Sequence, residues 1–373
     1  MTNNENMKGI SLFSNIGIAE LGLPKSFEVY KANEIDSNRC ELFKKIHRKI
    51  EIINADIRNK ETQKKLTEDK VDFLISTPPC QGMSTAGKMD RFDPRNHLIK
   101  YSIDLILKTK PMYVFHENVP GQDMTEIKVD HNTMKISEYI DTSLKDTYHI
   151  ISKKVDMSDF GVPQSRKRSI FLLTRKDINP IWKFPNKTNK ATIKEAIGLL
   201  PALDPFISEK EFDEHKIFHN FENKLKKALS ISPLHVPVAH PMRQIISMQY
   251  TPTGQTAFDN IDVYKPKNRE GKLIKGFYNT YKRMEWNKPA PTITTYNRTI
   301  SSQQNVHPGR RTYHGSNVLY SDPRVLTLYE LMKIMTIPEK INISSQDNTP
   351  GLRSYIGEGI PPLFIKHCFK MIK

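Results

Sequence analysis

Short apolar segments alternate with longer amphipathic stretches along the first half of the chain. The apolar segments have the length of buried strands, and the stretches between them are long enough to hold crossover helices. The clearest strand candidates are residues 9–13, 27–33, 71–76, 112–115 and 170–174. Because parallel strands need such crossovers, the pattern predicts an α/β fold with a doubly wound, mostly parallel sheet.

A turn that carries a cysteine follows the third strand candidate, in the run Thr77-Pro78-Pro79-Cys80-Gln81-Gly82. Two successive prolines restrict φ and prevent a helix, so Cys80 should lie in a rigid loop at a strand end. Reactive groups of α/β enzymes are found at such ends. One interpretation of Cys80 is a nucleophile, and the other is a small buried apolar side chain, which is commoner for a lone cysteine. The motif alone leaves both open.

Two other strand ends carry polar or turn-forming residues. Glu117 and Asn118 follow the strand candidate at 112–115, so a carboxyl group can face Cys80. The run Leu-Phe-Ser-Asn-Ile-Gly at 12–17 predicts a strand-to-helix turn where a cofactor could approach the backbone. Neither feature is specific by itself.

A basic run leads into the last strand candidate of this half. Residues 164–168 read Gln-Ser-Arg-Lys-Arg and precede the apolar segment at 170–174. Strand alternation predicts that Gln164, Arg166 and Arg168 share one face. Two guanidinium groups and one amide would then converge on a ligand rich in hydrogen-bond acceptors.

In this order and spacing, these stretches resemble the C5-cytosine DNA methyltransferases. The resemblance covers nearly the whole chain, since residues 283–295, 324–331 and 357–362 are similar to the closing blocks of that family. The resemblance implies the fold of class I S-adenosylmethionine-dependent methyltransferases. It also implies methyl transfer to carbon 5 of a flipped-out cytosine in a specific duplex DNA sequence.

The resemblance implies four catalytic residues. Cys80 would be the thiolate that adds to C6 of cytosine. The carboxyl group of Glu117 would donate a proton to N3 or share one with it. We expect Arg168, more than Arg166, to contact the base, while Arg166 would orient Glu117 or a phosphate. The alternative interpretations are a helix-capping carboxylate at Glu117 and a basic surface strand for the two arginines.

The resemblance also implies that S-adenosylmethionine binds at the carboxyl edge of the sheet. An aromatic residue would line the adenine pocket, a glycine would allow close approach of the methionine part, and two acids would accept from the ribose hydroxyls and the adenine amino group. The predicted cofactor-binding residues are Phe13, Gly17, Glu34, Asp56, Ile57 and Pro78.

Three positions depart from the family pattern. Asn15 and Ile18 stand where the family has glycines, and Glu358 stands where it has asparagine. Asparagine tolerates positive φ, so we expect the turn after the first strand to be kept.

Residues 82–96 are expected to close over an extruded base, with glycines as hinges and basic residues on phosphates. An ordinary glycine-containing surface loop is the alternative. The predicted DNA-binding residues are Gln81, Ser84, Lys88, Arg91, Arg95 and Gln164.

Composition agrees with a polyanionic partner. The 373 residues include 57 Lys plus Arg against 41 Asp plus Glu, a net charge of +16. This suits double-stranded DNA, although a lysine-rich proteome would give the same excess. Three widely spaced cysteines predict neither a disulfide framework nor a metal site. With no leader and no apolar run that could span a membrane, we expect a monomeric cytoplasmic protein that associates with the nucleoid through DNA. A restriction endonuclease is a further candidate partner.

The alternation weakens after about residue 186, where His, Pro, Gly and Thr become frequent. We predict a catalytic and cofactor-binding domain at 1–185 plus 350–373, and a target-recognition domain at 186–349. Two other functions stay open. An RNA or tRNA cytosine-5 methyltransferase would share the nucleophile motif, but the irregular second region argues against it. A catalytically silent DNA-binding regulator would share the fold, but intact Cys80, Glu117 and Arg168 argue against it.

Overall fold

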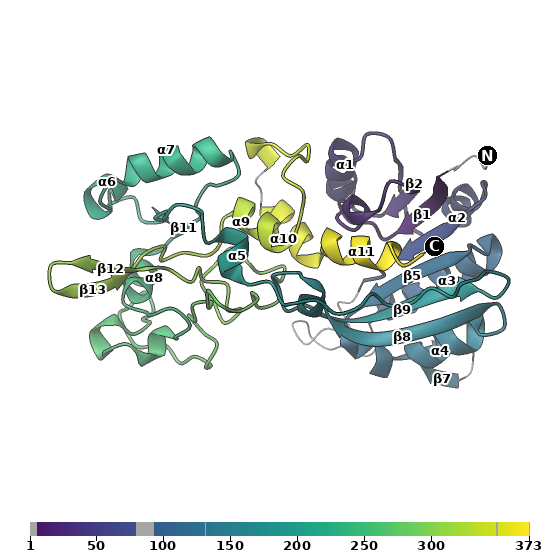
Figure 1. Cartoon of the computed structure of the whole chain (residues 1–373). Helices are drawn as coiled ribbons and strands as arrows, with labels where there is room; N and C mark the ends of the chain where they lie inside the picture. The colour runs from purple at the N-terminus through teal and green to yellow at the C-terminus, as the bar shows by residue number, and fades with distance from the viewer. Residues whose placement is uncertain (1–5, 80–92, 131, 348–349, 373) are drawn as a thin grey trace. The chain divides into compact units, whose positions relative to one another are not determined.

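The computed structural model describes residues 6–79, 93–130, 132–347 and 350–372 (Figure 1). Two compact units divide the chain. The first unit comprises residues 1–160, 166–188 and 359–373, and the second comprises 161–165 and 189–358. The first unit is therefore built from three separate stretches of sequence.

A seven-stranded sheet forms the centre of the first unit, in the order β3-β2-β1-β4-β5-β9-β8. Only β9 runs antiparallel to its neighbours, β5 and β8. This confirms the predicted α/β fold with a mostly parallel sheet. The strands are β1 (Met7–Leu12), β2 (Phe27–Glu34), β3 (Glu51–Asn54), β4 (Phe73–Ser76), β5 (Tyr113–Asn118), β8 (Tyr148–Asp156) and β9 (Lys167–Arg175).

Two strands of this sheet, β3 and β8, were not among the sequence predictions. Both lie at an edge of the sheet. Most residues of β8 are exposed or half-buried, so it lacks the apolar pattern of a buried strand. β3 has only four residues, of which two are buried.

Helices cover both faces of the sheet. The helices α2 (Lys60–Leu66), α3 (Leu98–Thr109) and α4 (Ile136–Leu144) share one apolar core with β1, β4 and β5. On the opposite face, α1 (Ser37–Ile46) packs on β2 and β3 through Phe43. The same face carries an aromatic group that includes Phe73, Phe115, Trp182 and Phe369.

The last helix, α11 (Pro362–Phe369), belongs to the first unit although the second unit precedes it in sequence. Phe369 contacts Phe73 of β4, and the indole Nε1 of Trp182 donates to the Cys368 carbonyl at 2.8 Å. Gly22 of η1 (Glu20–Gly22) packs directly on the Pro362 carbonyl, where a side chain would not fit. These contacts hold α11 against the sheet.

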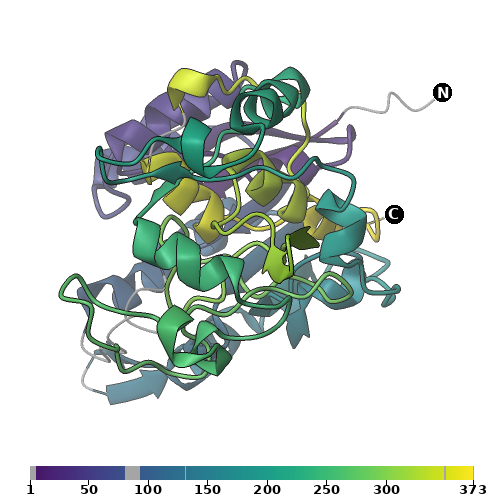
Figure 2. The ribbon, with the colours of Figure 1, turned by 90° about the vertical axis from the view of Figure 1, so that its left-hand side faces the viewer.

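The second unit has little regular structure (Figure 2). Short helices alternate with long loops and two small sheets, β10 with β11 and β12 with β13. The elements are α5 (Ile193–Ile197), β10 (Phe206–Ile207), α6 (Glu214–Ile217), α7 (Phe221–Ile231), β11 (Ala239–His240), α8 (Met242–Gln249), β12 (Arg311–His314), β13 (Asn317–Tyr320), α9 (Leu328–Ile334) and α10 (Pro350–Glu358).

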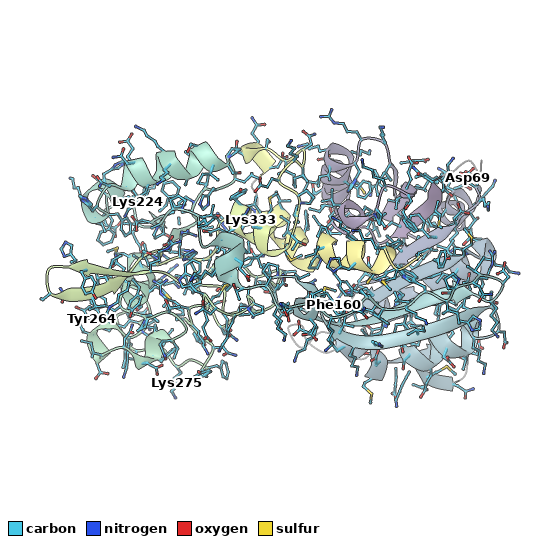
Figure 3. All side chains as sticks on the ribbon, in the orientation of Figure 1. Asp69, Phe160, Lys224, Tyr264, Lys275 and Lys333 are labelled. Carbon is cyan, nitrogen blue, oxygen red and sulfur yellow. The ribbon has the colours of Figure 1, made fainter. Side chains whose placement is uncertain are left out.

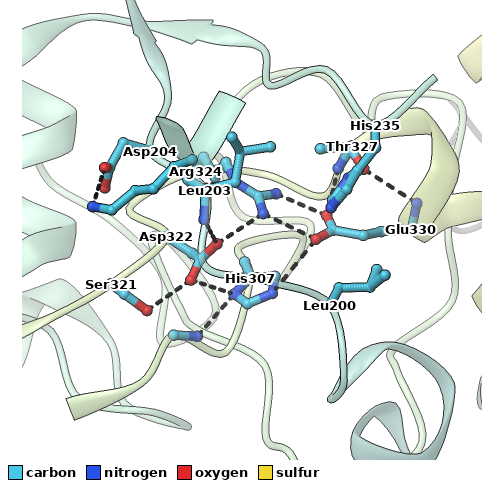
Figure 4. Close-up of polar contacts among 12 residues, drawn as sticks. Leu200, Leu203, Asp204, His235, His307, Ser321, Asp322, Arg324, Thr327 and Glu330 are labelled. Atoms are coloured by element: carbon cyan, nitrogen blue, oxygen red, sulfur yellow. Dashed lines mark hydrogen bonds and ion pairs between the residues drawn. The ribbon is translucent and has the colours of Figure 1, made fainter. Parts of the chain in front are cut away.

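A buried polar network supports the second unit in place of a large sheet (Figure 4). The guanidinium group of Arg324 donates to Asp322 at 2.8 Å, to Glu330 at 2.7 and 2.9 Å, and to the Leu203 carbonyl at 2.7 Å. His307 lies between the same two carboxylates. Its Nδ1 accepts from the Gly309 amide, and burial lowers the pKa of His307 to about 4, so the ring is neutral.

Candidate active site

The carboxyl ends of the parallel strands lie at one edge of the sheet. The strand register pairs Leu12 of β1 with Asn33 of β2 and with Ser76 of β4. Ser76 in turn pairs with His116 of β5. The turns that follow these strands carry the predicted cofactor-binding and catalytic residues, and they therefore meet at one edge.

The turn after β1 is left-handed at three residues. Phe13, Asn15 and Gly17 have φ values of 58°, 52° and 80°. Asn15 thus keeps the conformation that a glycine would allow, as its tolerance of positive φ predicted. The backbone amide of Asn15 donates to Glu34 Oε2 at 3.0 Å, which joins this turn to the end of β2.

Gly17 is required by packing as well as by its backbone angle. A side chain at this position would overlap His47 and Phe43. The ring Nε2 of His47 lies 2.7 Å from the Gly17 carbonyl. The structure therefore gives Gly17 a role in seating the turn against α1, and its predicted contact with a cofactor stays a prediction.

Glu34 is buried at the end of β2 and is held by backbone amides. Oε1 accepts from Ile35 at 2.8 Å and from Asp36 at 3.0 Å, while Oε2 accepts from Asn15. Arg39 Nη1 lies 4.0 Å from Oε2, an ion-pair distance but not a hydrogen bond. A carboxylate has about four acceptor positions, so the three amides leave one for a hydroxyl group. The geometry suits an acid that binds a ribose.

The other predicted cofactor residues occupy neighbouring turns. Asp56, after β3, accepts from the backbone and guanidinium of Arg58, and the hydrogen bond from this side chain lowers the pKa of Asp56. Ile57 is buried in the core of the first unit, and Phe13 packs against the same core. The Pro78 carbonyl accepts from the side chain of Asn118 at 3.1 Å.

An ion pair joins two of the predicted catalytic residues. Arg168 Nε lies 2.7 Å from Glu117 Oε1, with side chains only 12% and 9% exposed. The sheet register explains the contact, because Asn118 of β5 pairs with Ser169 of β9 and thereby places Glu117 diagonally opposite Arg168. A carboxyl group and a cation thus stand together at the strand end.

The predicted common face of Gln164, Arg166 and Arg168 is not a strand face, because β9 begins only at Lys167. Arg166 is 1% exposed, and its backbone amide donates to Asp156 Oδ1 at 3.1 Å. Arg168, which we expected to contact the base, makes the contact with Glu117 that we had considered for Arg166.

A family model described as C-5 cytosine-specific DNA methylase matches residues 7–373. The chain belongs to this family. It is a C-5 cytosine DNA methyltransferase of the restriction-modification type.

Curated relatives of this methylase include Type II enzymes. It is 38% identical to the Type II methyltransferase M1.HgaI of Avibacterium volantium, over 99% of this chain and 98% of the relative. It is 26% identical to M1.HphI of Haemophilus parahaemolyticus, over 95% of this chain and 83% of the relative.

Solved structures share the fold. An E. coli prophage protein solved as a candidate DNA modification methyltransferase has a TM-score of 0.65 and 20% identity, covering 98% of both chains. The Entamoeba histolytica methyltransferase EhMeth has a TM-score of 0.59 and 13% identity, covering 98% of this chain and 97% of its own. The family and this fold are those of S-adenosylmethionine-dependent methyltransferases.

Five predicted residues of the methylase lie outside the described part of the chain. They are Cys80, Gln81, Ser84, Lys88 and Arg91. The residues just before them are well anchored. Thr77 Oγ1 donates to the Phe13 carbonyl at 3.1 Å, and Asn118 holds the Pro78 carbonyl. The chain thus reaches Cys80 from a point tied both to the turn after β1 and to the end of β5.

The two described cysteines are poor candidates for a nucleophile. Cys40 and Cys368 are buried and free. Burial raises the pKa of Cys40 to about 11 and raises that of Cys368 further. Since the thiolate is the reactive form, neither side chain would be ionised near neutral pH.

Two predicted DNA-binding residues have partners within the protein. Gln164 is fully buried in the second unit, where its Oε1 accepts from the Ile293 amide at 3.1 Å and its Nε2 lies 2.8 Å from Met335 Sδ. In this arrangement its amide is not exposed to DNA. Arg95 is half-exposed and makes a bidentate pair with Asp93, at 2.9 and 2.5 Å.

Sequence reasoning missed a series of buried, hydrogen-bonded side chains beside the site. His116 Nδ1 lies 3.3 Å from Ser76 Oγ, which donates to Ser102 Oγ at 3.0 Å. The other ring nitrogen lies 2.9 Å from Gln122 Oε1. Burial lowers the pKa of His116 to about 4, so the ring is neutral. The sequence does contain a signal for these hydrogen bonds, because His116 is a polar residue within an apolar strand and directly precedes Glu117.

The described residues hold no group of three or more His, Cys, Asp or Glu side chains that could bind a metal ion. None of their helices has the length and hydropathy to cross a bilayer.

Proposed function

We propose that this methylase transfers the methyl group of S-adenosylmethionine to carbon 5 of a cytosine flipped out of a specific duplex DNA sequence, through a covalent bond between Cys80 and C6. The Glu117–Arg168 ion pair carries this proposal. It lies at the sheet edge where Pro78 and Pro79 lead into Cys80. Cys40 and Cys368 are buried thiols, which leaves Cys80 as the nucleophile.

The carboxyl edge fits the proposed cofactor. Glu34 keeps one acceptor position for a ribose hydroxyl, and the left-handed turn at 13–17 lies beside it. We propose that Phe13, Gly17, Glu34, Asp56, Ile57 and Pro78 hold S-adenosylmethionine. The cofactor supplies an electrophilic methyl group.

The chain supplies the activation of the base. Carbon 5 of cytosine is a poor nucleophile until a thiolate adds at C6 and moves electron density toward C5, N3 and O2. Glu117 would donate a proton or share one at N3, and Arg168 beside it would stabilise charge at O2. After methyl transfer, a base removes the C5 hydrogen, and the bond between C6 and sulfur breaks.

This mechanism predicts a trapped covalent adduct. Fluorine at C5 cannot be removed as a proton, so duplex DNA with 5-fluorocytosine at the target should leave the protein attached. The adduct should resist denaturant, require S-adenosylmethionine and map to Cys80 by peptide mass analysis. Cys80→Ser should abolish it, and Glu117→Gln should slow it about 100-fold or more.

Two controls accompany the adduct experiment. Bisulfite sequencing of DNA from a host that expresses the gene identifies the target cytosine. Cys80→Ser should still bind DNA and S-adenosylmethionine, which separates lost chemistry from lost folding. An adduct at Cys40 or Cys368, or turnover without any adduct, would refute the mechanism.

We further propose that the second unit reads the DNA sequence while the first unit holds the chemistry. The second unit has long loops and little regular structure, which suits the reading of groove edges by side chains. The boundaries that we propose for the functional domains, 185/186 and 349/350, lie close to the limits of the compact units at 188/189 and 358/359.

A further inference from the structure

Residues 261–282 of the second unit form an exposed segment rich in apolar and basic side chains, here called the basic-aromatic segment. Phe277 is 82% exposed and Tyr278 is 72% exposed. Large apolar side chains at such exposure usually mark a contact surface when they gather in one stretch. The exposed apolar residues of the segment are Ile261, Val263, Leu273, Phe277 and Tyr278.

The segment carries much more positive charge than the rest of the chain. Its 22 residues include six Lys or Arg and two Asp or Glu, a net charge of +4, against +16 for all 373 residues. Among the described residues, no carboxylate makes an ion pair with Lys272 or Lys275, and both lysines are exposed. Lys282 Nζ lies 4.2 Å from the centre of the Tyr278 ring. Cations and aromatic rings are thus presented together.

The beginning of the segment is fixed on α8. The rings of Tyr250 and Tyr264 stack with centroids 3.4 Å apart, and Asn260 Nδ2 donates to the carbonyls of Ser247 and Tyr264 at 3.0 and 3.2 Å. A segment held in this way does not need to be ordered when a ligand binds.

The end of the segment is fixed as well. Tyr281 is buried, and its hydroxyl accepts from Gln244 at 2.7 Å. Thr256 Oγ1 donates to the Thr280 carbonyl at 2.7 Å, and Gly276 lies so close to the Phe258 ring that a side chain would not fit. Phe277 and Tyr278 are therefore displayed on a preorganised turn, which lowers the entropy cost of binding.

We propose that the basic-aromatic segment is the part of the second unit that enters the groove of duplex DNA, with Phe277 and Tyr278 against the bases or sugars and Lys272 and Lys275 on phosphates. The inference rests on the proposed methylation of DNA. Duplex DNA is the partner that fits, because it offers phosphates to the lysines and apolar base and sugar surfaces to the rings.

The test compares Phe277→Ala/Tyr278→Ala with the wild-type full chain. Binding to a duplex that contains the methylated sequence, and kcat/KM for its methylation, should both fall at least tenfold. Lys272→Ala/Lys275→Ala should weaken binding to any duplex and lower the slope of log affinity against log salt by about two. Binding of S-adenosylmethionine should be unchanged in both variants.

A matched control comes from α7 of the same unit. Lys226→Ala/Leu229→Ala also removes an exposed lysine and an exposed apolar side chain. Figure 3 places Lys224 of this helix far from Lys275 of the segment. DNA affinity of the control variant should stay within twofold of the wild type.

The outcomes separate this inference from the proposed function. A wild type that forms no adduct with 5-fluorocytosine DNA contradicts the proposed function. A wild type that forms the adduct, together with a Phe277→Ala/Tyr278→Ala variant that binds and methylates DNA normally, overturns only the inference. In that case the exposed rings do not contact DNA.

Discussion

At the scale of single residues, burial changes the protonation of one acid in the first unit, Glu20. Glu20 of η1 lies inside the unit and accepts from Ser11 Oγ at 2.5 Å. Its second carboxyl oxygen is buried without a hydrogen-bond partner among the described residues. Burial raises the pKa of Glu20 to about 7, although the hydrogen bond from Ser11 opposes the shift. The carboxyl group is therefore protonated in the folded protein over a range where the unfolded chain has lost the proton.

Glu20→Gln should stabilise the protein at high pH. Because the pKa of Glu20 is raised on folding, the contribution of its proton to stability is complete below about pH 4.5 and is lost as pH rises through about 7. Glutamine does not titrate. The difference in free energy of unfolding between the variant and the wild type should therefore favour the variant more at pH 8 than at pH 5, by on the order of 3 kcal/mol. Urea unfolding at the two pH values measures this difference.

Glu28→Gln is the control, since Glu28 is exposed on β2. This variant should change the free energy of unfolding by no more than about 0.5 kcal/mol at both pH values. An equal effect of Glu20→Gln at pH 5 and pH 8 would show that Glu20 does not titrate in this range.

At the scale of elements, one buried carboxylate both starts a helix and closes the polar network. Glu330 is the third residue of α9, where it forms a capping box with Thr327. The same carboxylate accepts two hydrogen bonds from Arg324. The start of α9 is thereby tied to Asp322 and to the Leu203 carbonyl, so several loops of the second unit depend on one guanidinium group.

Arg324→Met should destabilise the second unit by about 3–5 kcal/mol, because it leaves two buried carboxylates without their cation. The two tryptophans allow each unit to be followed separately, since Trp182 lies in the first unit and Trp286 in the second. In a Trp182→Phe background, the Trp286 fluorescence transition should move to lower denaturant. In a Trp286→Phe background, the Trp182 transition should move less.

Lys333→Ala is the control, since Lys333 also lies on α9 and its ion pair with Glu339, beyond the end of that helix, is more exposed. This variant should lower the free energy of unfolding of the second unit by less than about 1 kcal/mol. Equal shifts of both tryptophan transitions in Arg324→Met would contradict a network that acts mainly within the second unit.

At the scale of the whole molecule, two units of different construction share one chain. The first unit is a sheet covered by helices, and the second is held by short helices and a polar network. The network joins residues 203, 307, 322, 324 and 330, which all lie in the second unit. A graft that cuts between these residues would separate charges from their partners.

Exchanging residues 189–358 for the matching region of a family member with another target should change the methylated sequence and preserve methyl transfer. Base contacts specify the sequence, and the first unit would keep Cys80, Glu117 and Arg168. These boundaries carry the whole polar network in one piece. Bisulfite sequencing of host DNA reads the outcome, and a chimera that is active on the original target would refute the division of labour.

The amino-acid sequence by itself determined the α/β class, five of the seven central strands, the family and the candidate catalytic residues. These depend on local signals, namely strand-length apolar runs and short motifs in fixed order. The strands β3 and β8 were missed because edge strands bury too little to show the pattern.

Only the tertiary structure decided which side chains meet. It paired Arg168 with Glu117, placed Gln164 inside the second unit, seated Gly17 against His47 and joined Arg324 to the Leu203 carbonyl. The physical reason is that such contacts arise from strand register and packing between segments far apart in sequence, for which no local pattern of residue types exists.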